Sequence, residues 1–240
     1  MDYRSFWNNR YATLQNESAS LPDEDQAERW NAVYAWYLRR WLPEDTQAPI
    51  LELGCGQGSF LEFLKSRGYA QVRGIDSSRE QAALCEKRGL AVTQGDALDF
   101  LRNNDHKFAA IVALDFIEHL TRDEALMFLE LAFGALEPGG RLILQTPNGE
   151  SPWVGSVFHG DLTHETCYTP HLLKKLLLSQ GFRGIQLRPC GPPPVDMQSS
   201  IRKLIWDGIT LVCRGLNLIE GAVTSGIYTR VFMVSAQVPE

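Results

Sequence analysis

The sequence predicts an α/β fold in which a parallel sheet is covered by helices on both faces. Short apolar segments alternate with segments of helical character, and the loops between them are short. The apolar run Ile50–Leu53 ends in three alternate glycines, Gly54, Gly56 and Gly58, and helix-favouring sequence begins at Phe60. A tight glycine turn between a buried strand and a helix is where open α/β sheets bind nucleotides.

Size and charge narrow the class of protein. The chain has 240 residues, 44% of them hydrophobic, which is enough for one globular domain with elaborations. Its formal net charge of −6 argues against a nucleic-acid binder. Residues 171–240 carry eight Lys/Arg and four Asp/Glu, a balance of +4, so the remainder carries −10.

The cysteines and the apolar runs indicate the compartment. Five cysteines without any Cys-x-x-Cys pair disfavour a disulfide scaffold or a zinc knuckle and fit a reducing cytosol. The first residues lack the apolar core of a signal peptide, and no apolar run approaches the length of a spanning helix. We therefore expect a cytoplasmic protein that is soluble or at most peripheral at the inner face of a membrane.

The elements before the glycine turn are expected to form an N-terminal helical cap, residues 1–47. Residues 1–20 are aromatic and polar, as suits a segment folded over a pocket or a loosely attached terminus. Apolar side chains from Trp30 to Trp41 then recur at helical spacing, a pattern more typical of packing than of ligand contact. Residues 48–240 form the main domain.

The elements after the turn alternate regularly up to residue 146. The expected helices are Phe60–Arg67, Glu80–Arg88 and Asp123–Leu136, and the expected strands are Val72–Asp76, Ala91–Gln94, Lys107–Leu114 and Arg141–Thr146. Pro138, Gly139 and Gly140 are expected to break the third helix before the strand begins.

The later part is less regular. A polar loop, Pro147–Thr169, holds two histidines, His159 and His164, and a helix over Pro170–Gln180 and a strand over Arg183–Arg188 follow. An insertion at 192–226 contains the amphipathic segment Ile201–Ile219, and Tyr228–Val238 is a last strand.

Acidic residues end three successive predicted strands. Asp76 lies about twenty positions after Gly54, where an acid can accept hydrogen bonds from ribose hydroxyls. Asp96 and Asp115 end the next two strands, and helix capping is the alternative explanation for Asp76 and Asp96. Glu52 precedes the turn and suits a cationic ligand, and Ser59 stands at the position where a dinucleotide fold has its third glycine.

These motifs resemble the class I S-adenosylmethionine-dependent methyltransferases. The resemblance covers about residues 48–147, and its motifs are Glu52–Gly58, Asp76, Gly95–Ala97, Leu114–Leu120 and Leu136–Gly140. The Ile-Glu-His-Leu form is similar to the branch with ubiquinone-pathway O-methyltransferases and bacterial cell-envelope glycan methyltransferases. The resemblance implies a Rossmann-like, doubly wound, seven-stranded, mostly parallel sheet whose last strand is antiparallel.

The resemblance also implies a cofactor site for S-adenosyl-L-methionine. Gly54 and Gly56 would contact its methionine part, Asp76 its ribose, Asp96 and Ala97 its adenine, and the Leu114 carbonyl its amino group. Glu52, Cys55 and Ser77 adjoin these positions and complete the expected set.

Two histidines are candidates for the base that a hydroxyl acceptor would need, because the imidazole pKa lies near neutrality. His119 follows the fourth strand beside the expected methyl site and is the first candidate, and His164 is the second. A structural role is the alternative for each. His119, Asp161 and His164 could also hold a divalent ion, but the compact spacing of zinc ligands is missing, and we expect no metal.

The expected function is methylation of a hydroxyl on a small molecule or a glycan-type cell-envelope precursor. Alternatives are a phenol or quinone-ring O-methyltransferase, an NAD-dependent dehydrogenase and a non-catalytic protein of the same fold. The segment 201–219 carries one apolar helical face with Arg202, Lys203 and Arg214 beside it. It could lie on an anionic membrane, or it could be a lid or a homodimer helix.

Overall fold

The computed structural model describes residues 24–240, so the aromatic segment 1–20 lies outside the described residues, and the expected cap over residues 1–47 remains a prediction. The strands are β1 (Ile50–Leu53), β2 (Val72–Asp76), β3 (Val92–Gln94), β4 (Phe108–Leu114), β5 (Leu136–Pro147), β6 (Arg183–Pro189) and β7 (Val231–Gln237). The helices are α3 (Glu24–Leu38), α4 (Ser59–Ser66), α5 (Arg79–Lys87), α6 (Ala97–Arg102), the 3₁₀ turn η1 (Ile117–His119), α7 (Arg122–Ala135), α8 (Gly155–Phe158), α9 (Pro170–Ser179) and α10 (Met197–Glu220).

The seven strands form one sheet in the order β3-β2-β1-β4-β5-β7-β6. Pairs among β1 to β5 are parallel, whereas β7 inserts between β5 and β6 and runs antiparallel to both. The predicted fold class is therefore confirmed, including the antiparallel last strand. The strand order reverses beside β1, so the carboxyl ends of β1 and β4 flank the point where such sheets bind ligands.

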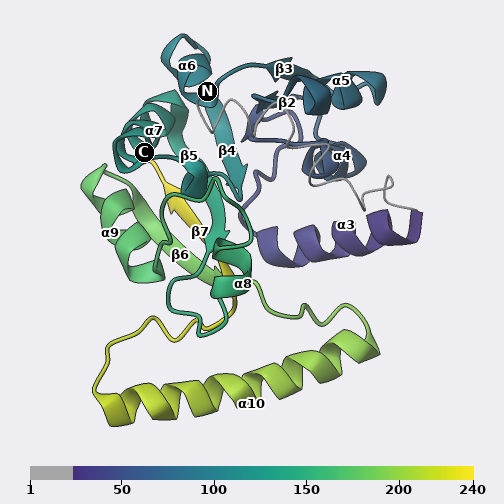
Figure 1. The fold of residues 1–240 in the computed structure, drawn as a ribbon. Coiled ribbons are helices and arrows are strands. Elements are labelled where there is room, and N and C mark those ends of the chain that lie inside the picture. Colours follow the sequence, from purple (N-terminus) through teal and green to yellow (C-terminus); the bar gives the residue numbers. More distant parts are fainter. Residues whose placement is uncertain (1–23) are drawn as a thin grey trace.

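Alternate side chains along the strands build two cores, one on each face of the sheet. Leu51, Leu53 and Ile111 face the layer of α6, α7 and α9, whereas Ile50 and Val112 face α3 and α4 (Figure 1). Successive strand residues point to opposite faces, so a nearly continuous apolar run is what a sheet buried on both sides requires.

The fifth strand begins five residues before its expected start, whereas the end of the long helix differs from the expected Leu136 by one residue. Helix α7 ends at Ala135, and β5 begins at Leu136 rather than at Arg141. Phe108 pairs with Leu136 and Ala110 pairs with Arg141, so the Pro-Gly-Gly segment forms a bulge within the strand. Gly140 allows this bulge, because a Cβ there would lie 2.7 Å from the Glu137 carbonyl oxygen.

The insertion 192–226 is dominated by α10, which runs along one edge of the molecule, away from the sheet (Figure 1). Asp196 caps its first turn and Gly221 ends it in the left-handed conformation. No helix in residues 24–240 is both long enough and apolar enough to cross a bilayer.

Candidate active site

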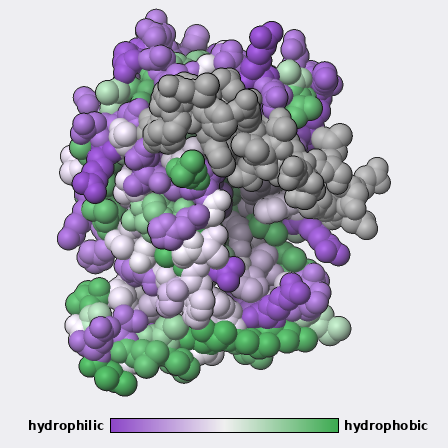
Figure 2. Space-filling view, viewed as in Figure 1, coloured by the Kyte–Doolittle hydropathy of each residue, from purple (hydrophilic) through white to green (hydrophobic). Residues whose placement is uncertain are grey.

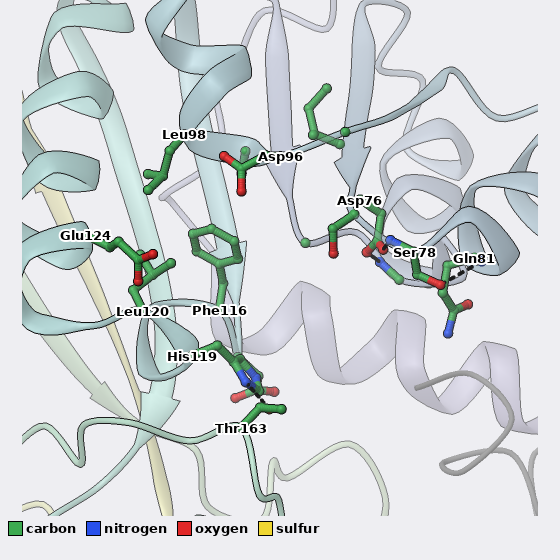
Figure 3. Close-up of a pocket in the computed structure, with 17 residues that line it drawn as sticks. Asp76, Ser78, Gln81, Asp96, Leu98, Phe116, His119, Leu120, Glu124 and Thr163 are labelled. Atoms are coloured by element: carbon green, nitrogen blue, oxygen red, sulfur yellow. Dashed lines mark hydrogen bonds between the residues drawn. The ribbon is translucent and has the colours of Figure 1, made fainter. Parts of the chain in front are cut away.

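A cavity of about 250 Å³ opens at the carboxyl ends of β1, β2 and β4 (Figure 3). Its lining includes seven of the residues predicted from the sequence, namely Gly54, Gly56, Asp76, Ser77, Asp96, Ala97 and His119. Glu52, Cys55, Leu114 and His164 do not line it. The glycine turn and the acids at the strand ends, far apart in sequence, thus share one cavity.

The glycine turn is held open by backbone hydrogen bonds and by Asp76. The amides of Gly54 and Cys55 both donate to the Ile75 carbonyl, at 2.8 and 3.1 Å. The Gly56 amide donates to Asp76 Oδ2 at 2.7 Å, and the Ser78 amide donates to Asp76 Oδ1 at 2.8 Å. Asp76 therefore joins the turn after β1 to the start of α5, and its carboxylate faces the cavity.

Gly54 and Gly56 both have positive φ angles, so substituting them tests whether the turn requires glycine and whether a ligand lies against it. Gly54 has φ 67°, and a Cβ there would lie 2.9 Å from Phe116 Cδ2, whereas Gly56 has φ 51° with nothing within 4 Å. We expect Gly54→Ala to lower stability by about 1–2 kcal/mol for the left-handed backbone, with the Phe116 contact adding to this loss. We expect Gly56→Ala to melt at a higher temperature than Gly54→Ala and still to lose cofactor affinity.

Thermal melts of the two variants and titration with S-adenosylhomocysteine measure these effects. Gly89→Ala is the matched control, since Gly89 also has a positive φ and open space but lies outside the cavity. Unchanged affinity in Gly56→Ala would contradict a ligand lying against this turn.

Asp96 has the alternative role that the sequence left open. Its Oδ1 accepts a hydrogen bond from the Asp99 amide at 2.9 Å, so Asp96 caps α6. It also lines the cavity beside Ala97, opposite Asp76 (Figure 3). Capping fixes the carboxylate at the cavity edge, so the two roles are compatible.

Glu52 is buried beneath the turn rather than lining the cavity. It is 3% exposed, and its Oε2 has no hydrogen-bond partner. Burial raises the pKa of Glu52 well above its ordinary value, and the neighbouring Cys85 and Asp76 add to the rise. An acid beneath the turn, with one oxygen unpartnered, would favour the cationic group of a ligand that lies against the turn.

The backbone is strained at the end of β4, just before residues that line the cavity. Asp115 is one of two non-glycine residues with positive φ in the described chain, at 49°. Its Oδ2 accepts a hydrogen bond from Gln145 Nε2 at 2.7 Å. The Asp115 side chain is exposed at the cavity, but the protein around it displaces part of its solvent, and this desolvation raises its pKa. Such strain concentrates at functional sites, and the residues that follow Asp115 include Phe116 and His119, which line the cavity.

The predicted histidines meet on the side of the cavity opposite the glycine turn. The rings of His119 and His164 lie 4.7 Å apart between centroids. His119 Nδ1 lies 2.7 Å from Thr163 Oγ1, and the Thr163 hydroxyl donates to Asp161 Oδ1 at 2.6 Å. Because that hydroxyl proton is directed to Asp161, Thr163 accepts from His119, which places the imidazole proton on Nδ1.

The protein environment sets the protonation states of His119 and Asp161. Burial lowers the pKa of His119 to about 4, and the neighbouring His164 contributes to the drop. Burial acts to raise the pKa of Asp161, but hydrogen bonds from Thr163 outweigh it and hold that pKa below its ordinary value. At neutral pH, His119 is therefore neutral, and the Asp161 carboxylate that is linked to it through Thr163 is ionised.

Glu118 joins the histidines, and it is a residue that sequence reasoning missed. It is fully buried, and neither carboxylate oxygen has a partner with full hydrogen-bond geometry. Burial raises the pKa of Glu118 well above its ordinary value, although Thr146 and the Glu118 backbone act to lower it. Ligand atoms of Glu118, His119 and His164 lie within 4.8 Å of one another. The signal was present in the string Ile-Glu-His-Leu, whose acid the sequence analysis left without a role.

These three residues fit a divalent cation, since imidazole nitrogen and carboxylate oxygen are suitable donors and a cation would stabilise the ionised form of Glu118. His164 Nδ1 donates to the Phe158 carbonyl at 2.8 Å, which directs its other nitrogen to the cluster. A bound cation would polarise an acceptor oxygen. Asp161, which the sequence analysis grouped with the histidines, supports His119 through Thr163 instead.

Comparison with known proteins gives the family. A family model described as a methyltransferase domain matches residues 23–187. The chain belongs to that methyltransferase family. The resemblance to class I methyltransferases, based on residues 48–147, is thereby confirmed.

Curated relatives are distant and longer. The chain is 25% identical over 114 residues to the mitochondrial ubiquinone biosynthesis O-methyltransferase of Dictyostelium discoideum, covering 41% of this chain and 35% of that protein. It is 29% identical over 152 residues to the rat protein of the same name, covering 55% and 43%. This methyltransferase thus spans less than half the length of the curated relatives it matches.

Solved structures agree in fold along nearly the whole chain. The structure of an S-adenosylmethionine-dependent methyltransferase from Archaeoglobus fulgidus superposes with a TM-score of 0.66 at 21% identity, covering 98% of this chain and 100% of that one. The similarity therefore includes the later elements, α9, β6 and β7, which the motif resemblance did not reach.

Proposed function

We propose that this methyltransferase uses S-adenosyl-L-methionine to methylate a hydroxyl group on a small molecule or a glycan-type cell-envelope precursor. The proposal rests on one cavity. The glycine turn, Asp76 and Asp96 line one side of it, and His119 lines the other. The first side suits a sulfonium nucleoside, and the second suits an acceptor that must lose a proton.

Residues at different strand ends would contact different parts of the cofactor. The backbone of Gly54 and Gly56 would contact the methionine part, the Asp76 carboxylate the ribose hydroxyls, and Asp96 with Ala97 the adenine. The Leu114 carbonyl at the end of β4 would accept from the amino group. S-adenosyl-L-methionine brings an already activated methyl group, so the protein contributes alignment and proton removal.

His119 is the proposed proton acceptor. The acceptor hydroxyl gives its proton to the imidazole while its oxygen bonds to the methyl carbon, and the carbon–sulfur bond breaks to release S-adenosylhomocysteine. The positive charge formed on His119 is stabilised through Thr163 by the Asp161 carboxylate. His164, in ring contact with His119, is the second proposed catalytic residue.

The names of the curated relatives favour a ring hydroxyl as a second acceptor class. Two of the curated relatives are named ubiquinone biosynthesis O-methyltransferases and a third is named a probable fatty acid methyltransferase, and Phe116 lines the cavity wall. Phenol or quinone-ring precursors therefore belong in any acceptor screen beside nucleotide sugars and envelope glycolipids.

Two measurements test this function. We expect calorimetric titration to give micromolar affinity for S-adenosylhomocysteine and no binding of NADH. We then expect radiolabelled methyl transfer into at least one of the three acceptor sets. Binding of NADH alone would contradict the methyltransferase assignment of the cavity, and transfer to an amine instead of a hydroxyl would contradict O-methylation.

The transfer assay also decides the role of the Glu118 cluster when it is run in parallel with EDTA and with Mg²⁺. Full activity in EDTA is the result expected of a histidine base. Activity that requires the cation would instead assign both imidazoles, with Glu118, to a metal site.

A further inference from the structure

A second cavity, of about 590 Å³, lies between α10 and the body of the protein. Its lining comes from the loops after β5 and β6, from α10 and from the residue before β7, and it includes Trp153, Cys190, Pro192, Trp206, Ile209 and Arg230. Its volume falls within the range of roughly 300–1,000 Å³ that is typical of small-molecule sites. None of these residues has a role in the cofactor cavity at the carboxyl ends of β1, β2 and β4.

Trp206 points inward, unlike most of the large apolar side chains of α10. Leu204, Leu211 and Ile219 are 74%, 71% and 85% exposed. Figure 2 shows a hydrophobic row along the edge of the molecule that α10 forms. The Trp206 ring instead lies 5.4 Å from that of Trp153, at an angle of 59° between the planes. The two indole rings therefore form an aromatic wall of the second cavity.

The second cavity also offers polar groups that the protein itself does not use. Neither the Trp153 nor the Trp206 indole N–H donates a hydrogen bond to another residue within 24–240. Arg230 forms no ion pair with a carboxylate in that part of the chain. A ligand in this cavity would therefore meet aromatic faces, two N–H donors and one positive charge without a partner.

One side chain separates the second cavity from the cofactor cavity. Cys190 lines the second cavity, and its Sγ lies 3.9 Å from Gln145 Oε1. Gln145 Nε2 donates to Asp115 Oδ2 at 2.7 Å, and Asp115 lines the cofactor cavity. The loop after β5 contributes to both, since it carries Trp153 at one cavity and Thr163 at the other. A molecule in the second cavity is therefore one side chain away from the methyl-transfer site.

We infer that the second cavity binds the nucleoside diphosphate part of a nucleotide sugar, whose sugar extends past Gln145 to the cofactor cavity. A nucleobase can stack on an indole ring, and diphosphate oxygens accept hydrogen bonds from a guanidinium and from N–H groups. An acyl chain would leave Arg230 and both indole donors unused, and a single phenol ring would occupy only one of the two cavities. The inference rests on the proposed function, because it names the acceptor whose hydroxyl reaches His119.

Calorimetric titration of the full chain, saturated with S-adenosylhomocysteine, tests the inference. The probes are UDP-glucose, GDP-mannose and dTDP-glucose, and we expect at least one to bind with submillimolar affinity. We expect Trp206→Ala to weaken that binding about tenfold, since it removes the stacking surface. Arg230→Gln is expected to weaken it about tenfold or more, since it removes a charged hydrogen bond. Trp206→Phe keeps an aromatic ring and should stay within a few-fold of wild type.

The matched controls are Trp30→Ala on α3 and Arg73→Gln on β2, two exposed residues that line neither cavity. Both should bind the nucleotide sugar like the wild type, and all variants should keep their affinity for S-adenosylhomocysteine. Absence of binding of all three probes overturns the inference, as does unchanged affinity in Trp206→Ala and Arg230→Gln.

A phenolic acid serves as the competing probe. Binding of caffeate that depends on Trp206, without binding of any nucleotide sugar, would assign the second cavity to a phenolic ring and overturn the inference. Loss of nucleotide-sugar binding while S-adenosylhomocysteine still binds concerns the second cavity alone. Absence of S-adenosylhomocysteine binding would instead contradict the proposed function, so the two failures are distinguishable.

Discussion

Asp76→Ala is expected to weaken binding of S-adenosylhomocysteine about thirtyfold or more. The carboxylate holds the Gly56 and Ser78 amides and would also accept hydrogen bonds from the ribose. Loss of charged hydrogen bonds costs about 1.5–3 kcal/mol each, and about 1.4 kcal/mol corresponds to tenfold in affinity. Calorimetric titration measures the change.

Two controls separate ligand contact from general loss of structure. Asp99→Asn removes a carboxylate on α6 that is exposed and pairs with Arg102 at 2.5 Å, and it should leave the affinity unchanged. Asp76→Asn keeps one acceptor oxygen and should lie between wild type and Asp76→Ala. An Asp76→Ala protein that binds within threefold of wild type would remove Asp76 from the cofactor site.

His119→Ala is expected to reduce kcat by about 10²–10⁴-fold while affinity for S-adenosylhomocysteine stays within a few-fold of wild type. A positioned general base contributes an effect of this size, and His119 lies on the side of the cavity away from the glycine turn. His171→Ala is the matched control, because His171 is exposed on α9. Equal turnover in the His119 and His171 variants would mean that His119 is not the base.

The pH dependence of kcat gives a second, independent reading of His119. The base must be neutral, and its neutral form predominates above its pKa, which burial lowers to about 4. Turnover should therefore hold as the pH falls through about 6.5, the ordinary histidine value, and decline only toward about pH 4. Thr163→Val removes the link to Asp161, so it should lower kcat and move this limb, whereas a purely structural role for Thr163 would leave the limb in place.

The order of the helices and strands, and the residues on the cofactor side of the cavity, could be predicted from local sequence patterns. An apolar run, a glycine turn and an acid at a strand end can be recognised within a few residues, because strand burial, positive φ and backbone exposure are local requirements. Seven predicted residues therefore line the cavity, and β1, β2 and β4 lie where the sequence placed them. The bulge in β5 was missed because its pairing with Phe108 depends on a neighbouring strand.

The arrangement of residues on the acceptor side of the cavity could not be predicted from local sequence patterns. Nothing within a few residues of Glu118 shows that its carboxylate is buried beside two imidazoles, because His164 reaches it from a loop more than forty residues later. Likewise, the sequence analysis named Asp161 as a possible ligand, whereas the fold interposes Thr163 between it and His119.

For α10 the sequence determined that one helical face is apolar, and the tertiary structure decided where that face points. Periodicity fixes the angle between side chains on one helix, but it carries no information on the rotation of that helix about its axis. That rotation is set by contacts such as Trp206 with Trp153 and Asn217 with Tyr228, which join segments distant in the chain. The same apolar stripe that would ordinarily be read as core is in this protein its outer surface.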